Sequence, residues 1–134
     1  MSHHRSTPGR YVSAILPWFR VVFGTIGTLF PRLLGRSYGL SSPETGSYDV
    51  ALRYASIRAV GLGIGQLLAP PDRQRDWDRV ALLVDTLDTL MVIHAGVRGR
   101  ISGTSALVML CGTMTGLLGG LLVELTRGEV GDPA

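Results

Sequence analysis

The residues from 101 to 123, ISGTSALVMLCGTMTGLLGGLLV, carry no charged side chain. A helix needs about 20 mainly apolar residues to cross the hydrocarbon core of a bilayer. Lipid leaves the backbone no water to bond, so a span of this kind must be helical or part of a closed barrel. The run therefore predicts a transmembrane helix over 101–123 and argues against the alternative of a soluble helical protein.

The run before it, WDRVALLVDTLDTLMVIHAGV (77–97), predicts a second membrane helix that carries Asp85 and Asp88 near its middle. Residues three apart on a helix are neighbours on one face, so the two carboxylates lie together. Carboxylates at that depth are costly unless they are paired, protonated or facing a wet cavity. The chain must therefore pair these acids, keep them protonated or expose them to water.

Two further apolar runs predict spans at 11–34 and 49–69. The first contains Pro17 and Arg20, which allow two placements. A span from 11 to 30 would put Arg20 near the midplane, where it needs a partner. If Pro17 instead occupies the first turn, Arg20 lies at headgroup level and the helix ends near 34, which is the placement we expect. The Pro-, Gly- and Ser-rich residues 31–49 predict a connection.

These spans predict an all-α fold, a four-helix transmembrane bundle with antiparallel up-down connectivity. The 134 residues form one integral membrane domain, with flexible tails at 1–10 and 128–134. Four spans place both termini on one side, and six arginines against four favour a cytoplasmic location for them in the plasma (inner) membrane. The six are Arg5, Arg10, Arg73, Arg75, Arg79 and Arg127, and the four are Arg32, Arg36, Arg98 and Arg100.

Small residues recur at every fourth position in two of the predicted helices. Such faces let helices approach closely in a membrane. They indicate internal packing, or a face for a homo-oligomer or a membrane-protein partner. The helix-packing residues that we predict are Ala55, Ala59, Gly63, Gly112, Gly116 and Gly120.

Composition excludes several other classes of function. All 13 basic residues are Arg and they are spread along the chain, which is not the footprint of a nucleic-acid-binding protein. One cysteine, Cys111, cannot form an internal disulfide, and we expect it to be buried as a small hydrophobe. No metal or cofactor is predicted, and the predicted partner is the lipid bilayer. His94 is a possible ligand-binding residue near the end of its helix.

The predicted site is a polar cluster between the second and third spans. Arg58 and Asp88 each fall near the centre of their span, and antiparallel neighbours would bring them to the same depth. Asp85 lies one helical turn away, roughly 4.5 Å along the axis. Arg20 is a possible second cation. The cluster either orients the bundle only or lines a polar cavity for a small ligand or proton.

Two stretches, RVVFGTIGTLFPRLLGRSYGL and LRYASIRAVGLGIGQLL, resemble a family of small bacterial and fungal four-helix membrane proteins catalogued as a domain of unknown function. Ser56 and Ala59 stand where the family has Gly and Asp. More distantly, the chain is similar to DoxX-like membrane proteins, some of which are redox-associated accessory subunits. Neither resemblance implies a catalytic residue. The matching residues are Arg20, Gly24, Pro31 and Gly39, then Arg53, Ile57, Arg58 and Gly63.

The function that these observations favour is a non-enzymatic membrane protein, either an accessory subunit or a small-ligand binder. One alternative is a redox- or quinone-linked component, which would use His94, Trp77 and Tyr48. A second alternative is a proton-coupled transporter or channel, which would use Asp85 and Asp88, because acids within a membrane mark proton relays.

Overall fold

The computed structural model describes residues 8–38 and 46–128, and this part of the chain contains helices and no strand. The predicted all-α fold is confirmed. Five helices follow one another along the chain: α1 (Pro8–Leu29), α2 (Pro31–Ser37), α3 (Gly46–Leu68), α4 (Gln74–Val97) and α5 (Gly103–Gly128).

Proline and glycine set the breaks between helices. Phe30 leaves the helical region with φ −124° and ψ 59°, and Pro31 then occupies the first turn of α2, where its missing N–H costs nothing. Pro70 and Pro71 follow α3. Gly99 adopts φ +65° in the turn between α4 and α5, a conformation that side chains disfavour.

Several predicted boundaries differ from the structure. α1 begins at Pro8, so Pro17 lies inside the helix and not in its first turn, and α1 ends at Leu29 rather than near 34. The predicted connection 31–49 holds a short helix, α2, and the first residues of α3. α5 runs on to Gly128. The remainder of the two predicted tails, residues 1–7 and 129–134, lies outside the described residues.

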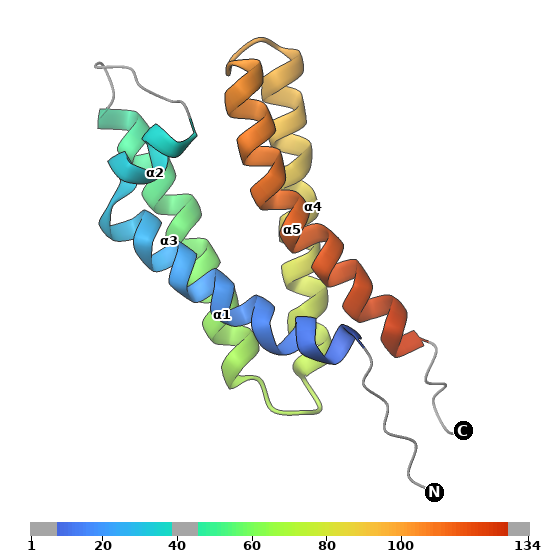
Figure 1. Ribbon diagram of the computed structural model, residues 1–134. Helices are drawn as coiled ribbons and strands as arrows, with labels where there is room; N and C mark the ends of the chain where they lie inside the picture. The colour runs from blue at the N-terminus through green and yellow to red at the C-terminus, as the bar shows by residue number, and fades with distance from the viewer. Residues whose placement is uncertain (1–7, 39–45, 129–134) are drawn as a thin grey trace, which may run out of the picture.

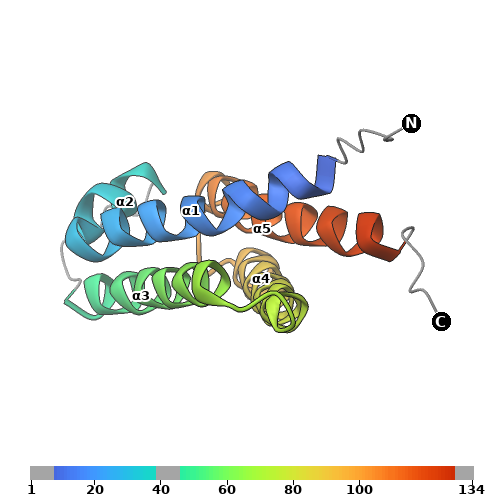
Figure 2. The same ribbon diagram turned by 90° about the horizontal axis from the view of Figure 1, so that it is seen from below.

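The four long helices are antiparallel in succession and form two pairs (Figure 1). α1 packs along α3, α4 packs along α5, and α1 also contacts α5, whereas α3 and α4 touch over a shorter stretch. The pairs meet at the end that carries both termini and spread apart towards α2 and the α4–α5 turn. Viewed from below, α1 and α5 form one side and α3 and α4 the other (Figure 2).

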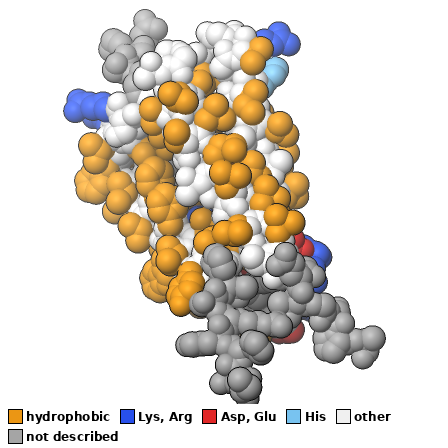
Figure 3. Space-filling model, turned by 45° about the vertical axis from the view of Figure 1, so that its right-hand side comes forward, with side chains coloured by type: hydrophobic (Ala, Val, Ile, Leu, Met, Phe, Trp, Pro, Cys, Tyr) orange, Lys and Arg blue, Asp and Glu red, His pale blue; other side chains and the backbone are white. Residues whose placement is uncertain are grey.

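Three of the described helices are long and apolar enough to cross a membrane, by length and composition: Tyr11–Leu29, Gln74–Val97 and Gly103–Thr126. They suggest an integral membrane protein. The prediction of four such helices was one too many by this measure, because α3 includes Arg53, Arg58 and Gln66, which lower its hydropathy. Apolar side chains cover the middle of the face in Figure 3, with charged groups gathered at its ends.

Glycines set the closest approaches between helices. A Cβ on Gly63 of α3 would lie 2.7 Å from the Pro17 carbonyl oxygen, and a Cβ on Gly24 of α1 would lie 2.6 Å from that of Ser56. Gly120 of α5 lies against Leu82. Gly112 has no neighbour within 4 Å of such a Cβ, and Ala55 is exposed. Among the described residues, therefore, neither position is a close contact between helices.

Candidate functional site

Arg20 occupies the junction of three helices. It projects from the middle of α1 and is only 7% exposed. Its Nη1 donates a hydrogen bond to Oε1 of Gln66 on α3 at 2.6 Å, and its Nη2 donates to Oδ2 of Asp85 on α4. Because arginine stays charged even when desolvated, the carboxylate and the amide oxygen together replace the water that burial removed.

Gln66 extends this contact towards the end that carries the termini. Its Nε2 donates to Oδ1 of Asp78 on α4 at 2.7 Å, and both side chains are buried. Asp85, Arg20, Gln66 and Asp78 thus form one hydrogen-bonded series across α1, α3 and α4, which we call the polar chain. It joins the two helix pairs at a place where α3 and α4 touch over a short stretch only.

A cavity of about 10 Å³ adjoins the polar chain, bounded by Arg20, Gln66, Asp78 and apolar side chains that include Leu16 and Val123. This is roughly the space that a single water molecule occupies. Ser13 on α1 also lines it. The cavity is too small for an organic ligand, so any role of the polar chain in binding is limited to water or a proton.

A second ion pair lies about one helical turn further along α4. Arg58 of α3 donates from Nη2 to both carboxylate oxygens of Asp88 at 2.5 Å. Unlike the polar chain, this pair reaches the molecular surface, with the side chains of Arg58 and Asp88 48% and 30% exposed. Within residues 8–38 and 46–128, Nη2 is the guanidinium nitrogen that donates, so Nε and Nη1 remain available to a further acceptor.

α5 supplies no charge to either pair, yet it shapes the surroundings of Asp85. A Cβ on Gly116 would lie 2.6 Å from Asp85 Oδ2. Because Gly116 has no side chain, the Asp85 carboxylate can lie directly against the backbone of α5. This explains one glycine of the predicted α5 face as a neighbour of the polar chain rather than a helix-packing contact alone.

The structure brings Arg58 together with Asp88, and Arg20 with Asp85. The burial of Arg20 agrees with the first of the two sequence placements, in which it lies deep and needs a partner. Each of the two carboxylates, on Asp85 and on Asp88, accepts hydrogen bonds from a guanidinium group. Chemically, this arrangement holds helices together and neutralises charge, with no activated nucleophile or base among these four residues.

His94 is exposed near the end of α4, apart from the cluster, and the described residues include no group of three metal-ligating side chains. Trp77 lies at the opposite end of α4, where its ring packs on Gly65. The side chain of Tyr48 lies outside the described residues. The structure therefore does not bring His94 and Trp77 together. Cys111 is exposed, contrary to the expected burial, because it lies on the outer face of α5.

Gln66 and Asp78 were not among the predicted site residues. Asp78 precedes Asp85 by seven residues, which places it two turns away on the same stripe of α4. Gln66 is the one amide in the apolar second half of α3. Asp78 falls at the very start of the predicted span 77–97, and a polar residue at a helix end does not by itself indicate a buried contact.

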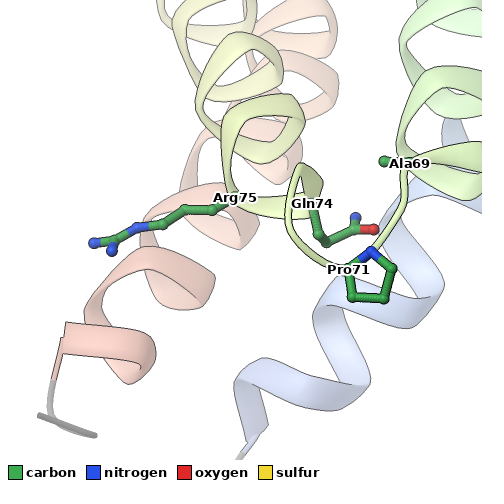
Figure 4. A pocket seen from close by; sticks show the side chains of 4 residues that line it. All are labelled: Ala69, Pro71, Gln74 and Arg75. Atoms are coloured by element: carbon green, nitrogen blue, oxygen red, sulfur yellow. The ribbon is translucent and has the colours of Figure 1, made fainter. Parts of the chain in front are cut away.

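The termini end carries a separate, exposed ion cluster. Arg75 and Arg79 of α4 donate to Oε1 of Glu124 on α5 at 3.2 and 2.9 Å. An open hollow beside it, at the α3–α4 turn, is lined by Ala69, Pro71, Gln74 and Arg75, with Arg75 pointing away from the other three (Figure 4). Among the described residues, Arg75 is the one charged side chain that lines this hollow, and it is exposed, so the hollow carries no argument for a ligand.

Comparisons of the chain with protein-family models, with curated proteins and with solved structures found no match. The resemblances described from the sequence remain predictions.

Proposed function

We propose that the chain is a non-enzymatic integral membrane protein that serves as an accessory subunit of a membrane complex. In this proposal α1, α3, α4 and α5 all lie in the bilayer, and α3 faces a transmembrane helix of the partner. Three helices are apolar enough to span, and α3 runs antiparallel to α1 along most of its length (Figure 1). The predicted location in the plasma (inner) membrane is part of the proposal.

The observation that carries the proposal is the half-exposed ion pair of Arg58 and Asp88. Both residues lie near the middle of their helices, so in a bilayer they would face the hydrocarbon core. Charged side chains at that depth face a bundle interior or a water-filled cavity. Because this pair is open on the surface of the isolated chain, a covering helix would remove it from lipid.

The surroundings of the pair support a helix as the covering group. Ala51, Ala55 and Gly61 of α3 are exposed, and a Cβ on Gly61 would meet nothing within 4 Å. Small exposed residues let a second backbone come close enough for its carbonyl or side-chain oxygens to accept from Arg58. The two free nitrogens of that guanidinium fit such an acceptor.

A photo-crosslinking amino acid at Ile57 tests the proposal in native membranes. Ile57 neighbours Arg58 on α3 and is 56% exposed. Leu118 on α5 is 57% exposed and serves as the matched control, away from the proposed face. We expect a discrete crosslinked protein from position 57 and none from position 118, with the partner identified by mass spectrometry.

Equal crosslinking from both positions, or only lipid adducts from position 57, would overturn the proposed face. A crosslinked product with twice the mass of the chain would show that the face binds a second copy of the chain, which would overturn the accessory role. Loss of the crosslink in Arg58→Gln, with the chain still inserted, would show that the ion pair itself is recognised.

The polar chain favours a second candidate, a proton path. Asp78 and Asp85 are joined through Gln66 and Arg20, and a water-sized cavity adjoins them. Intramembrane acids of this kind mark proton relays. Proton flux in proteoliposomes that falls in Asp85→Asn, but not in Asp49→Asn at the exposed end of α3, would support it. Equal flux in liposomes with and without the protein would exclude it.

A further inference from the structure

The two ends of the molecule differ in how their arginines are paired. At the termini end, the described arginine side chains all have carboxylates nearby. Arg73 lies 3.7 Å from Asp72 and 4.0 Å from Asp76. Arg75 and Arg79 share Glu124. The positive charge of these three side chains is therefore largely offset within the chain.

The opposite end presents arginines that have no such offset among the side chains that the structure describes. Arg32 of α2 pairs with Asp49 at 3.3 Å, but Arg36, Arg98 and Arg100 are exposed and have no carboxylate within 4.0 Å among the described side chains. Figure 3 shows arginine side chains at the upper end of the face, and arginine beside acid at the lower end.

Local structure holds two of these arginines at the tip of the α4–α5 turn. Arg98 N–H donates to the His94 carbonyl at 3.0 Å, and Arg100 N–H donates to that of Ala95 at 2.9 Å. Gly99, with φ +65°, lies between them. The backbone is thus tied into a tight turn, and the two guanidinium groups project from a fixed base.

Exposed apolar side chains adjoin the same arginines. Val97, next to Arg98, is 84% exposed, and Leu33 of α2 is exposed beside Arg32 and one turn from Arg36. An apolar residue that can enter the acyl chains, next to a cation that can reach the headgroups, is the arrangement found at a membrane interface.

We propose that Arg36, Arg98 and Arg100 bind the phosphate groups of anionic phospholipids, so that this end of the molecule is selective for anionic lipid. Guanidinium binds phosphate oxygens through two parallel hydrogen bonds, and basic residues next to membrane helices attract anionic headgroups. The inference goes beyond the proposed subunit role, and it depends only on the chain lying in a bilayer.

The test measures lipid selectivity of the full chain in phosphatidylcholine bilayers that contain spin-labelled phosphatidylglycerol. About 1 kcal/mol per exposed arginine corresponds to roughly a fivefold preference for phosphatidylglycerol over phosphatidylcholine at these sites. Arg98→Gln with Arg100→Gln should lower the preference by at least half. Arg73→Gln with Arg75→Gln removes the same charge from the paired end and should leave the preference unchanged.

Helix content and retention in neutral bilayers verify that each variant is folded, and Arg36→Gln provides a second variant outside the turn. An equal loss of selectivity in both double variants, or no loss in either, would overturn the assignment. Displacement of phosphatidylglycerol by millimolar inorganic phosphate at constant ionic strength would also overturn it, because it would identify a site for free phosphate rather than a lipid headgroup.

Discussion

Arg20 is the residue on which most of the buried polar contacts depend, since it bonds to both Gln66 and Asp85. We expect Arg20→Leu to destabilise the fold by about 3 kcal/mol or more, because it leaves a carboxylate that is only 15% exposed and a buried amide oxygen without their donor. Unfolding in mixed micelles with increasing sodium dodecyl sulfate measures this loss.

Arg32→Leu is the matched control for Arg20→Leu. Its ion pair with Asp49 is on the surface, with the Arg32 side chain almost fully exposed, so its loss should cost less than about 1 kcal/mol. Equal effects of the two substitutions would contradict a special role for the polar chain.

A charge exchange tests the pair at the surface. We expect Arg58→Asp and Asp88→Arg each to lower the resistance of the fold to detergent, because each puts two like charges at facing positions in place of an ion pair. The double exchange should recover part of the loss, and a double-mutant cycle measures the coupling. Strictly additive losses would mean that the two residues do not interact in the membrane.

The sequence predicted some of these residues better than others, for a physical reason. Depth follows from position along a helix, so Arg58 and Asp88 could be placed at one level. The direction in which a side chain points depends on how each helix is rotated against its neighbours. The bond between Gln66 and Asp78 depends on that rotation and on the exact start of α4, neither of which the sequence pattern determines.

At the level of elements, α3 offers two glycines with opposite environments. A Cβ on Gly63 would lie 2.7 Å from the Pro17 carbonyl oxygen and 2.8 Å from a Val21 methyl group, whereas one on Gly61 would meet nothing. We expect Gly63→Ala to destabilise the α1–α3 pair by about 1–3 kcal/mol, and Gly61→Ala to be neutral or slightly stabilising. Detergent unfolding of the two variants side by side measures the difference, and equal stabilities would contradict the close packing.

α5 offers a second matched pair. Gly116→Ala places a methyl group against the carboxylate of Asp85, while Gly112→Ala extends away from the chain. The first substitution should weaken the contact between α5 and the polar chain. We expect it to lose stability in detergent unfolding and the second to keep it, so a greater loss from Gly112→Ala would instead indicate an external partner on that face.

Local chemistry could predict that helices exist but not always where they end. Pro31 was expected within a connection, yet it begins α2, since proline in a first turn is compatible with a helix. Pro17 was expected to mark a first turn, yet α1 continues through it. The proline residues alone do not decide either boundary. In the structure, α1 packs along α3, and the Pro17 carbonyl lies close to Gly63, a contact that no local pattern shows.

At the scale of the whole molecule, the three apolar helices lead to a direct expectation. The chain should remain with membranes after an alkaline carbonate wash and should enter solution only with detergent, because its apolar faces would otherwise meet water. Sedimentation followed by immunoblotting measures this. Release into buffer without detergent would contradict membrane integration.

The order of the charges along the chain has a consequence for synthesis. Both deep cations, Arg20 and Arg58, are translated before α4, and they precede their carboxylates by 65 and 30 residues. Until α4 emerges, a nascent α1–α3 hairpin carries two arginines that lipid does not accommodate well. If α3 lies in the bilayer as proposed, we expect stable insertion of the first half to depend on the second. Two fragments divided between α3 and α4 should accordingly be degraded when made alone and accumulate when made together.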